Sequence, residues 1–157
     1  MSLPEGFILR RATVNDLDTL VAHRRLMFQD MGYTDQAAMN TMSARLRPWL
    51  LDRMNSGDYH AWVVCASDGS IAAGTGLWLM DWIPHMIGQS SRRGNILNVY
   101  TAPDYRRRGL ARELMKGAID WCRENHIDTI ILHASPAGRA LYEELGFAAT
   151  NEMRLRL

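Results

Sequence analysis

The sequence predicts a layered domain that mixes helices and strands, in the α/β or α+β class. At 157 residues, the chain has the usual length of one domain and buries about two thirds of its unfolded surface in one core. Hydrophobic residues make up 47% of it and charged residues 22%, which is typical of a globular protein. Strand and helix patterns alternate along the chain without a repeat or a linker. We therefore expect a single domain over residues 1–157.

The first third of the chain predicts one strand followed by two helices. Residues 7–11 read as a short strand. Thr13 is followed three positions later by Asp16, an arrangement that resembles a capping box, so the first helix should begin there. A second helix is expected from about residue 36 to residue 54, with Pro48 marking a break or a kink in it.

The middle of the chain predicts a hairpin and a further strand. Residues 61–66 and 71–80 are strand-like and flank the turn sequence at residues 67–70, which indicates two antiparallel strands. Residues 84–94 are polar and contain glycine, so we expect a loop there. Strand character returns at residues 96–101 before a proline ends it.

The last third predicts a helix, a strand, a short helix and a final strand. Residues 110–122 form one continuous apolar helix face. Residues 129–133 are nearly all apolar, as in a sheet that is covered on both faces. A short helix over residues 139–145 should end at Gly146. Apolar and charged residues then alternate over residues 153–157, as in a half-buried strand.

Composition excludes several function classes. The 18 basic and 17 acidic residues leave a net charge of +1, which disfavours a nucleic-acid or anionic-membrane partner. No stretch approaches the roughly 20 apolar residues that span a bilayer, and the N-terminus lacks the pattern of a signal peptide. Cys65 and Cys122 lie far apart without metal-like spacing. We therefore expect a cytoplasmic protein that binds no metal.

One segment carries a candidate binding site. An amphipathic helix begins directly after the strand at residues 96–101, and three arginines, Gly109 and Ala111 stand at its start. The first turn of a helix has unpaired N–H groups and a partial positive charge, so a pyrophosphate can bind there. Two alternatives are a solvated arginine run and a nucleic-acid patch. A strand, a helix and a strand in succession also imply a right-handed crossover between parallel neighbours.

Two motifs in this region resemble the GNAT superfamily of N-acetyltransferases. The first is Arg106-x-x-Gly109-x-Ala111, and the second covers residues 140–147, Ala-Leu-Tyr-Glu-Glu-Leu-Gly-Phe. The resemblance implies a mixed, mostly antiparallel sheet with helices on both faces, splayed between its fourth and fifth strands. It also implies acetyl-CoA as the acetyl donor.

The resemblance further implies roles for particular residues. The backbone of Val99, Tyr100 and Thr101 would bind the pantetheine arm, and a bulge N–H near Val99 would polarise the acetyl carbonyl. Tyr142 would protonate the departing thiolate. Ser135 stands where many relatives carry an asparagine that touches the cofactor. Arg106 begins the first motif, and the pyrophosphate would be held by the backbone N–H groups of Arg107, Arg108, Gly109, Leu110, Ala111 and Arg112.

The implied activity is transfer of an acetyl group to a primary amine by direct attack in a ternary complex. The amine must lose a proton first. Many relatives use an acidic residue where this chain has Asn98 and Ile131, so the base is unassigned, with His133 and Asp81 as candidates. A module that binds acyl-CoA without turnover is the alternative.

The acceptor region of such proteins is formed by the first two helices and the segment between the third and fourth strands. In this chain these parts are rich in methionine and aromatic residues, which indicates either an adaptable pocket for a partly hydrophobic amine or core and dimer contacts. A homodimer is an alternative that the resemblance suggests. The residues concerned are Met27, Phe28, Met31, Tyr33, Met39, Met42, Met80, Trp82 and Met86.

Overall fold

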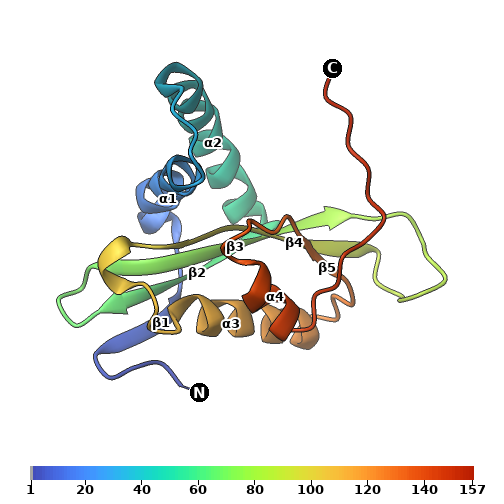
Figure 1. The fold of residues 1–157 in the computed structure, drawn as a ribbon. Coiled ribbons are helices and arrows are strands. Elements are labelled where there is room, and N and C mark those ends of the chain that lie inside the picture. Colours follow the sequence, from blue (N-terminus) through green and yellow to red (C-terminus); the bar gives the residue numbers. More distant parts are fainter. Residues whose placement is uncertain (1) are drawn as a thin grey trace.

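A five-stranded sheet forms the centre of the computed structural model, which describes residues 2–157 (Figure 1). Its strands lie in sequence order, and every neighbouring pair is antiparallel except the last, which is parallel. This confirms the predicted mixed, mostly antiparallel sheet. The strands are β1 (Phe7–Arg11), β2 (Tyr59–Ala66), β3 (Ile71–Asp81), β4 (Arg92–Thr101) and β5 (Ile130–Leu132).

Helices cover both faces of this sheet, as predicted. One face carries α1 (Leu17–Asp30) and α2 (Gln36–Ser56), and the other carries α3 (Leu110–Glu124) and the short α4 (Arg139–Glu144) (Figure 1). Two short 3₁₀ turns, η1 (Val14–Asp16) and η2 (Pro103–Tyr105), precede α1 and α3. Because α3 connects parallel β4 and β5, it is the expected crossover.

Local sequence explains where the first helices begin. Thr13 and Asp16 form a complete capping box, in which the Thr13 hydroxyl accepts from the backbone and the Asp16 carboxylate accepts from the Thr13 N–H. This box caps η1, and α1 follows directly. The Asp35 side chain caps α2 by accepting from the Ala38 N–H. Pro48 lies inside α2, which continues through it to Ser56, so of the two predicted alternatives, a break or a kink, the break is wrong.

Two apolar clusters hold the layers together. On the α3 face, Leu77 of β3 and Leu114 of α3 are completely buried. On the opposite face, Leu50 of α2 and Val63 of β2 are equally buried. Burying a leucine side chain contributes about 1.5–3 kcal/mol, so the sheet is anchored on both sides.

The hairpin confirms the sequence prediction, whereas β4 starts earlier than expected. β2 and β3 pair in antiparallel register around a turn in which Asp68 Oδ1 accepts from the Ser70 N–H. β4 begins at Arg92, so the loop covers residues 82–91 and not 84–94. Arg92 opposes Asp81 at the end of β3. Pairing with this long strand therefore extends β4 into a polar sequence.

The C-terminal segment corrects two expectations. β5 contains three half-buried residues at the sheet edge, so it is shorter and less covered than predicted for residues 129–133. Residues 147–157 contain no strand, and Met153 and Leu155 are 95% and 82% exposed. The segment runs past β5 and away from the sheet (Figure 1). Its alternating pattern finds no hydrogen-bonded partner strand.

The sheet opens between β4 and β5. Their parallel register covers Gly94 to Ile96 on β4 and ends where Ile96 opposes Leu132. Residues 97–101 continue as part of β4 and pair with β3 on one side only. The other edge of this segment is therefore free of a strand, which confirms the predicted splay.

Candidate active site

A β-bulge lies in β4 beyond the point where β5 separates. Gly76 opposes Leu97 and Gly74 opposes Tyr100, so Asn98 and Val99 together face one residue of β3. Asn98 has a left-handed backbone, with φ of 59°. The bulge therefore interrupts the ladder next to Val99, where the family resemblance implies it.

The free edge of β4 brings Val99, Tyr100 and Thr101 together. All three lie on the part of β4 that has no β5 partner. The Thr101 carbonyl is not free, because it accepts a 2.9 Å hydrogen bond from Arg106 Nε. An extended arm bound along this edge would thus meet the main-chain groups of Val99 and Tyr100 as its principal partners.

The start of α3 provides six consecutive backbone N–H groups without an acceptor. The Arg106 N–H donates to Pro103 and the Glu113 N–H to Gly109, but no described carbonyl or side chain accepts from residues 107–112. Such a row of N–H groups at a helix N-terminus binds anions. The observation fits a pyrophosphate, and the row follows directly from the free edge of β4.

Backbone conformation opens this row to a ligand. Gly109, the N-cap of α3, has φ of 79°, and Arg107 has φ of 61°. A Cβ placed on Gly109 would have no atom within 4 Å, so this side of the turn is open. Glycine is favoured there because of its positive φ.

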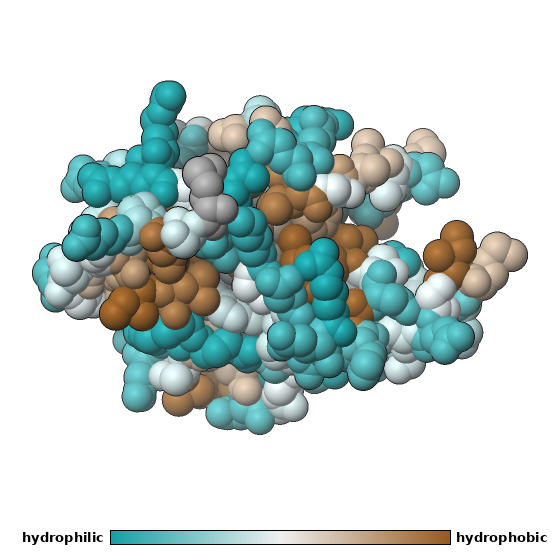
Figure 2. Space-filling model, turned by 90° about the horizontal axis from the view of Figure 1, so that it is seen from below, coloured by the Kyte–Doolittle hydropathy of each residue, from teal (hydrophilic) through white to brown (hydrophobic). Residues whose placement is uncertain are grey.

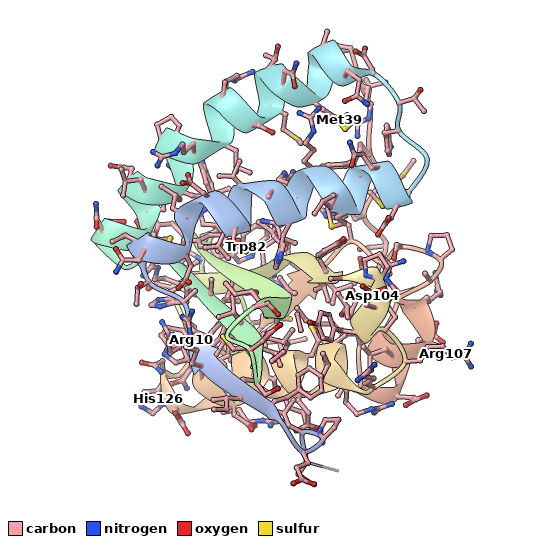
Figure 3. All side chains as sticks on the ribbon, turned by 90° about the vertical axis from the view of Figure 1, so that its left-hand side faces the viewer. Arg10, Met39, Trp82, Asp104, Arg107 and His126 are labelled. Carbon is pink, nitrogen blue, oxygen red and sulfur yellow. The ribbon has the colours of Figure 1, made fainter. Side chains whose placement is uncertain are left out.

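The arginines beside the row differ in their partners. Arg106 forms an ion pair with Asp30 of α1 at 2.5 Å, and Arg112 forms one with Glu144 of α4. Arg108 donates to the Asp104 carbonyl and packs over Tyr105. Arg107 is exposed and points away from the body (Figure 3). Arg107 and Arg108 have no ion pair with a described residue, so they can meet a phosphate.

Tyr142 lies on α4, where its ring is buried and 8% of the residue is exposed. It packs edge-on against Phe147 at 6.2 Å, and its ring would lie 2.8 Å from a Cβ on Gly138. Burial raises the pKa of Tyr142, so the phenol is protonated at neutral pH. Within residues 2–157 its hydroxyl has no hydrogen-bond partner, which leaves it free for a ligand.

The structure places Ser135 in a turn between β5 and α4. Its Oγ accepts from the Gly138 N–H at 3.2 Å, and its carbonyl accepts from the Arg139 N–H. Ser135 therefore shapes the start of α4, and its side chain is partly buried.

The two candidate bases lie in different places. Asp81 opposes Arg92, six residues from Asn98 along β4, which is about 20 Å from the bulge. His133 follows the last residue of β5, beside the opening, but its exposed side chain contacts Glu152 at 3.3 Å. The structure thus separates Asp81 from the site and leaves His133 at its edge.

A polar cluster beneath the bulge was not predicted from the sequence. Asn98 Oδ1 accepts from Arg24 Nη1 at 2.8 Å, and Asn98 Nδ2 donates to Tyr59 Oη at 3.1 Å. Burial raises the pKa of Tyr59 to about 12. His23 packs against the ring of Tyr100, and burial lowers its pKa to about 4. These residues come from three separate elements, α1, β2 and β4, so no single motif signals the cluster.

The methionine and aromatic residues of the expected acceptor region do not form one pocket. Met39 is buried in α2, whereas Met86 is 94% exposed in the loop after β3. Met39 and Trp82 come from separate elements (Figure 3), and Arg93 lies over the Trp82 ring. The apolar tip of the 82–91 loop projects from the body (Figure 2).

Residues 2–157 contain neither a cluster of metal ligands nor a membrane-spanning helix. No group of three or more His, Cys, Asp or Glu side chains is placed to hold a metal ion. None of the helices in this part of the chain is long and apolar enough to cross a membrane. Cys65 and Cys122 are free thiols, and Cys122 is buried.

The fold and the site define an α/β protein whose sheet opens beside a helix N-terminus with a row of unpaired N–H groups. The chain belongs to the GNAT family of acetyltransferases, because the model of the Acetyltransferase (GNAT) family matches residues 22–147. This family uses acetyl-CoA, and its activity is acetyl transfer.

Solved structures agree with this membership. A GCN5-related N-acetyltransferase from Ralstonia eutropha JMP134 is 35% identical, with a TM-score of 0.90 over 97% of this chain and 99% of that chain. A predicted acetyltransferase with acetyl-CoA from Clostridium acetobutylicum is 26% identical, with a TM-score of 0.87 over 96% and 95% of the two chains.

Proposed function

We propose that this protein transfers an acetyl group from acetyl-CoA to a primary amine of a small molecule or peptide, by direct attack in a ternary complex. The observation that carries the proposal is the row of six unpaired N–H groups at residues 107–112, directly after the free edge of β4. The pyrophosphate of the donor fits the row, and its pantetheine arm fits the edge. The similar Clostridium protein, described with acetyl-CoA, supports the choice of donor.

The chemistry needs three contributions from the chain. The bulge at Val99 would present an N–H to the thioester oxygen and stabilise the negative charge that develops there. The amine nitrogen attacks the thioester carbon, the carbon–sulfur bond breaks, and Tyr142 gives its proton to the departing thiolate. The ammonium form of the acceptor must lose a proton first, and Asn98 and Ile131 cannot accept one. We therefore propose that this proton passes through water to the bulk solvent and that the amine attacks in its neutral form.

A module that binds acyl-CoA without turnover is the second candidate. Asn98 and Ile131 favour it, because many relatives carry an acidic residue there. The free hydroxyl of Tyr142 favours the enzyme, because a binder has no need of a proton donor beside the sulfur. The single domain, the cytoplasmic location, a homodimer and the lack of nucleic-acid, membrane and metal partners stay predictions from the sequence.

The first experiment measures acetyl-CoA binding by calorimetry in the wild type and in Gly109→Asp. The aspartate adds a negative charge next to the pyrophosphate and strains a residue with φ of 79°, so we expect at least about a 100-fold weaker Kd. Gly57→Asp is the matched control. It carries the same charge at φ of 81° at the end of α2, also with open space around its Cβ.

A thiol-release assay over a panel of amines completes the test. Binding that Gly109→Asp weakens and Gly57→Asp preserves, together with thiol release, would support the enzyme. Binding without release on any amine would favour the module. An absence of binding in the wild type would contradict both.

A further inference from the structure

Asn98 links the catalytic bulge to a guanidinium group on α1. Its side chain is buried, and both ends of the amide are used: Oδ1 accepts from Arg24 and Nδ2 donates to Tyr59. This arrangement fixes the amide and holds Arg24 Nη1 at 2.8 Å from it. Arg24 therefore contacts the residue next to Val99, and we place the thioester oxygen at the Val99 N–H.

Arg24 is a partly buried cation without a counterion. It forms no ion pair with a residue of the described chain, and the ring of Phe28 lies 5.1 Å from its guanidinium. Burial lowers the pKa of Arg24. By contrast, Arg10 forms an ion pair with Asp16, and Arg92 forms one with Asp58. A partly desolvated guanidinium is costly unless an anion compensates it.

The remaining donors of Arg24 are available to a ligand. A guanidinium has five N–H groups in a planar fork, and Asn98 takes a hydrogen bond from Nη1. No other described side chain or carbonyl accepts from Arg24. The other charged residues of α1 near Arg24 have their own partners. Asp30 forms an ion pair with Arg106, and Arg25 donates hydrogen bonds to Asn40 and Gln36. The chain thus provides a fork that matches a carboxylate or a phosphate.

We infer that Arg24 anchors an anionic group of the acceptor, so that the substrate is a small primary amine carrying a carboxylate or a phosphate a few bonds from its nitrogen. The inference rests on the proposed function, since it uses the thioester position at Val99. The amine nitrogen must come within about 3–3.5 Å of the thioester carbon. An oxyanion on a short chain then reaches Arg24, and the fork holds the amine in an orientation for attack.

The test compares matched pairs of amines that differ in the anion. The pairs are glycine with glycinamide, β-alanine with β-alaninamide, and phosphoethanolamine with ethanolamine. We measure kcat/KM by thiol release in the wild type, in Arg24→Gln and in Arg25→Gln. The control Arg25→Gln removes the same charge from the next residue of α1. The two amines of a pair differ in basicity, so each variant is described by one ratio. This ratio is kcat/KM of the amine that carries the carboxylate or phosphate, divided by kcat/KM of its partner without that group.

We expect the wild type to favour the amine with the anionic group, either in the carboxylate pairs or in the phosphate pair. Which of these is preferred identifies the anion. Arg24→Gln should lower that ratio by about 10- to 100-fold, since it removes a charge-assisted contact. For amines without the anionic group, kcat/KM should change by less than about threefold in Arg24→Gln. Arg25→Gln should keep the wild-type ratio. Equal losses on both members would show a structural role for Arg24, and an unchanged ratio would also overturn the inference.

A binding measurement separates failure of this inference from failure of the proposed function. Each pair is titrated by calorimetry into the protein saturated with CoA, which requires no turnover. Tighter binding of the amine that carries the carboxylate or phosphate, lost in Arg24→Gln, would support the anion site even if no thiol is released. Turnover of amines without any dependence on their charge would leave the enzyme intact and exclude the anchor.

Discussion

Tyr142 is a buried tyrosine whose hydroxyl group differs from that of an ordinary core tyrosine. Buried tyrosine hydroxyls usually find a hydrogen-bond partner, as Tyr59 does with Asn98. The Tyr142 hydroxyl has none in the described chain, although its ring is buried against Gly138 and Phe147. A polar group left open in this way is suited to a ligand that arrives from solution.

Replacing Tyr142 with phenylalanine tests its proposed role as the proton donor. We expect kcat to fall by about 100-fold, the usual size of a general-acid contribution. The Kd of acetyl-CoA should stay within about twofold, since phenylalanine preserves the packing. Steady-state kinetics and calorimetry measure the two quantities. Unchanged kcat would contradict the role.

His23 gives a prediction about pH and stability. The residue is 6% exposed, and burial lowers the pKa of its imidazole from 6.5 to about 4. The unfolded chain therefore takes up this proton first as the pH falls. Its contribution to the free energy of unfolding is full above pH 6.5 and decreases between pH 6.5 and 4, by up to about 3 kcal/mol.

Urea unfolding of the wild type and His23→Leu over this pH range measures the effect. The leucine variant is expected to lose the part of the slope that comes from His23, so the wild type should lose stability relative to the variant as the pH falls from 6.5 to 4. Parallel curves would show that the pKa of His23 is the same in the folded and the unfolded chain, which would contradict the prediction.

At the scale of elements, β3 depends on glycine where side chains from its neighbours cross it. A Cβ on Gly76 would lie 1.7 Å from Tyr59 Oη, so the tyrosine that holds Asn98 occupies this space. We expect Gly76→Ala to lower the free energy of unfolding by about 2–4 kcal/mol, since backbone or ring must move. Chemical denaturation measures it, and a loss below 1 kcal/mol would contradict the close contact.

A glycine in α3 should behave in the opposite way. A Cβ on Gly117 would meet Leu9 and Trp62 at 3.8 Å, an ordinary contact distance. We expect Gly117→Ala to raise the free energy of unfolding by about 0.5–1 kcal/mol, because alanine favours a helix interior. The same denaturation experiment provides the comparison, and destabilisation would indicate that the α3 interface is tighter than described.

Most elements could be predicted because their signals are local. The capping box at Thr13 and Asp16, the turn after β2 and the apolar face of α3 each lie within a few residues of the structure they specify. Apart from the break expected at Pro48, the errors occur where strand pairing decides. Arg92 joins β4 because β3 continues beside it, and residues 153–157 alternate like a strand without pairing.

At the scale of the whole molecule, the site lies where layers from distant parts of the chain meet. The opening of the sheet comes from the short β5, the row of unpaired N–H groups from the start of α3, and the cluster at Arg24 from α1. A ligand that spans β4 and α3 would therefore stabilise the folded state as a unit.

Acetyl-CoA is expected to raise the melting temperature of the whole domain. At a concentration of 100 times Kd the stabilisation is about 2.7 kcal/mol, which corresponds to a shift of about 5–10 °C for a chain of this length. Thermal unfolding with and without the ligand measures it. Gly109→Asp should show almost no shift, whereas an equal shift in both proteins would place the ligand elsewhere.

The sequence by itself determined the family resemblance, the alternation of elements and the strand, turn and helix that carry Val99 to Arg112, since these depend on neighbours along the chain. Only the tertiary structure decided which side chains meet at the bulge. Arg24 and Asn98 are 74 positions apart, and Tyr59 and Asn98 are 39 apart. Their contact exists because α1 packs on the sheet and the Tyr59 side chain crosses β3 at Gly76, which buries polar groups that must then satisfy one another.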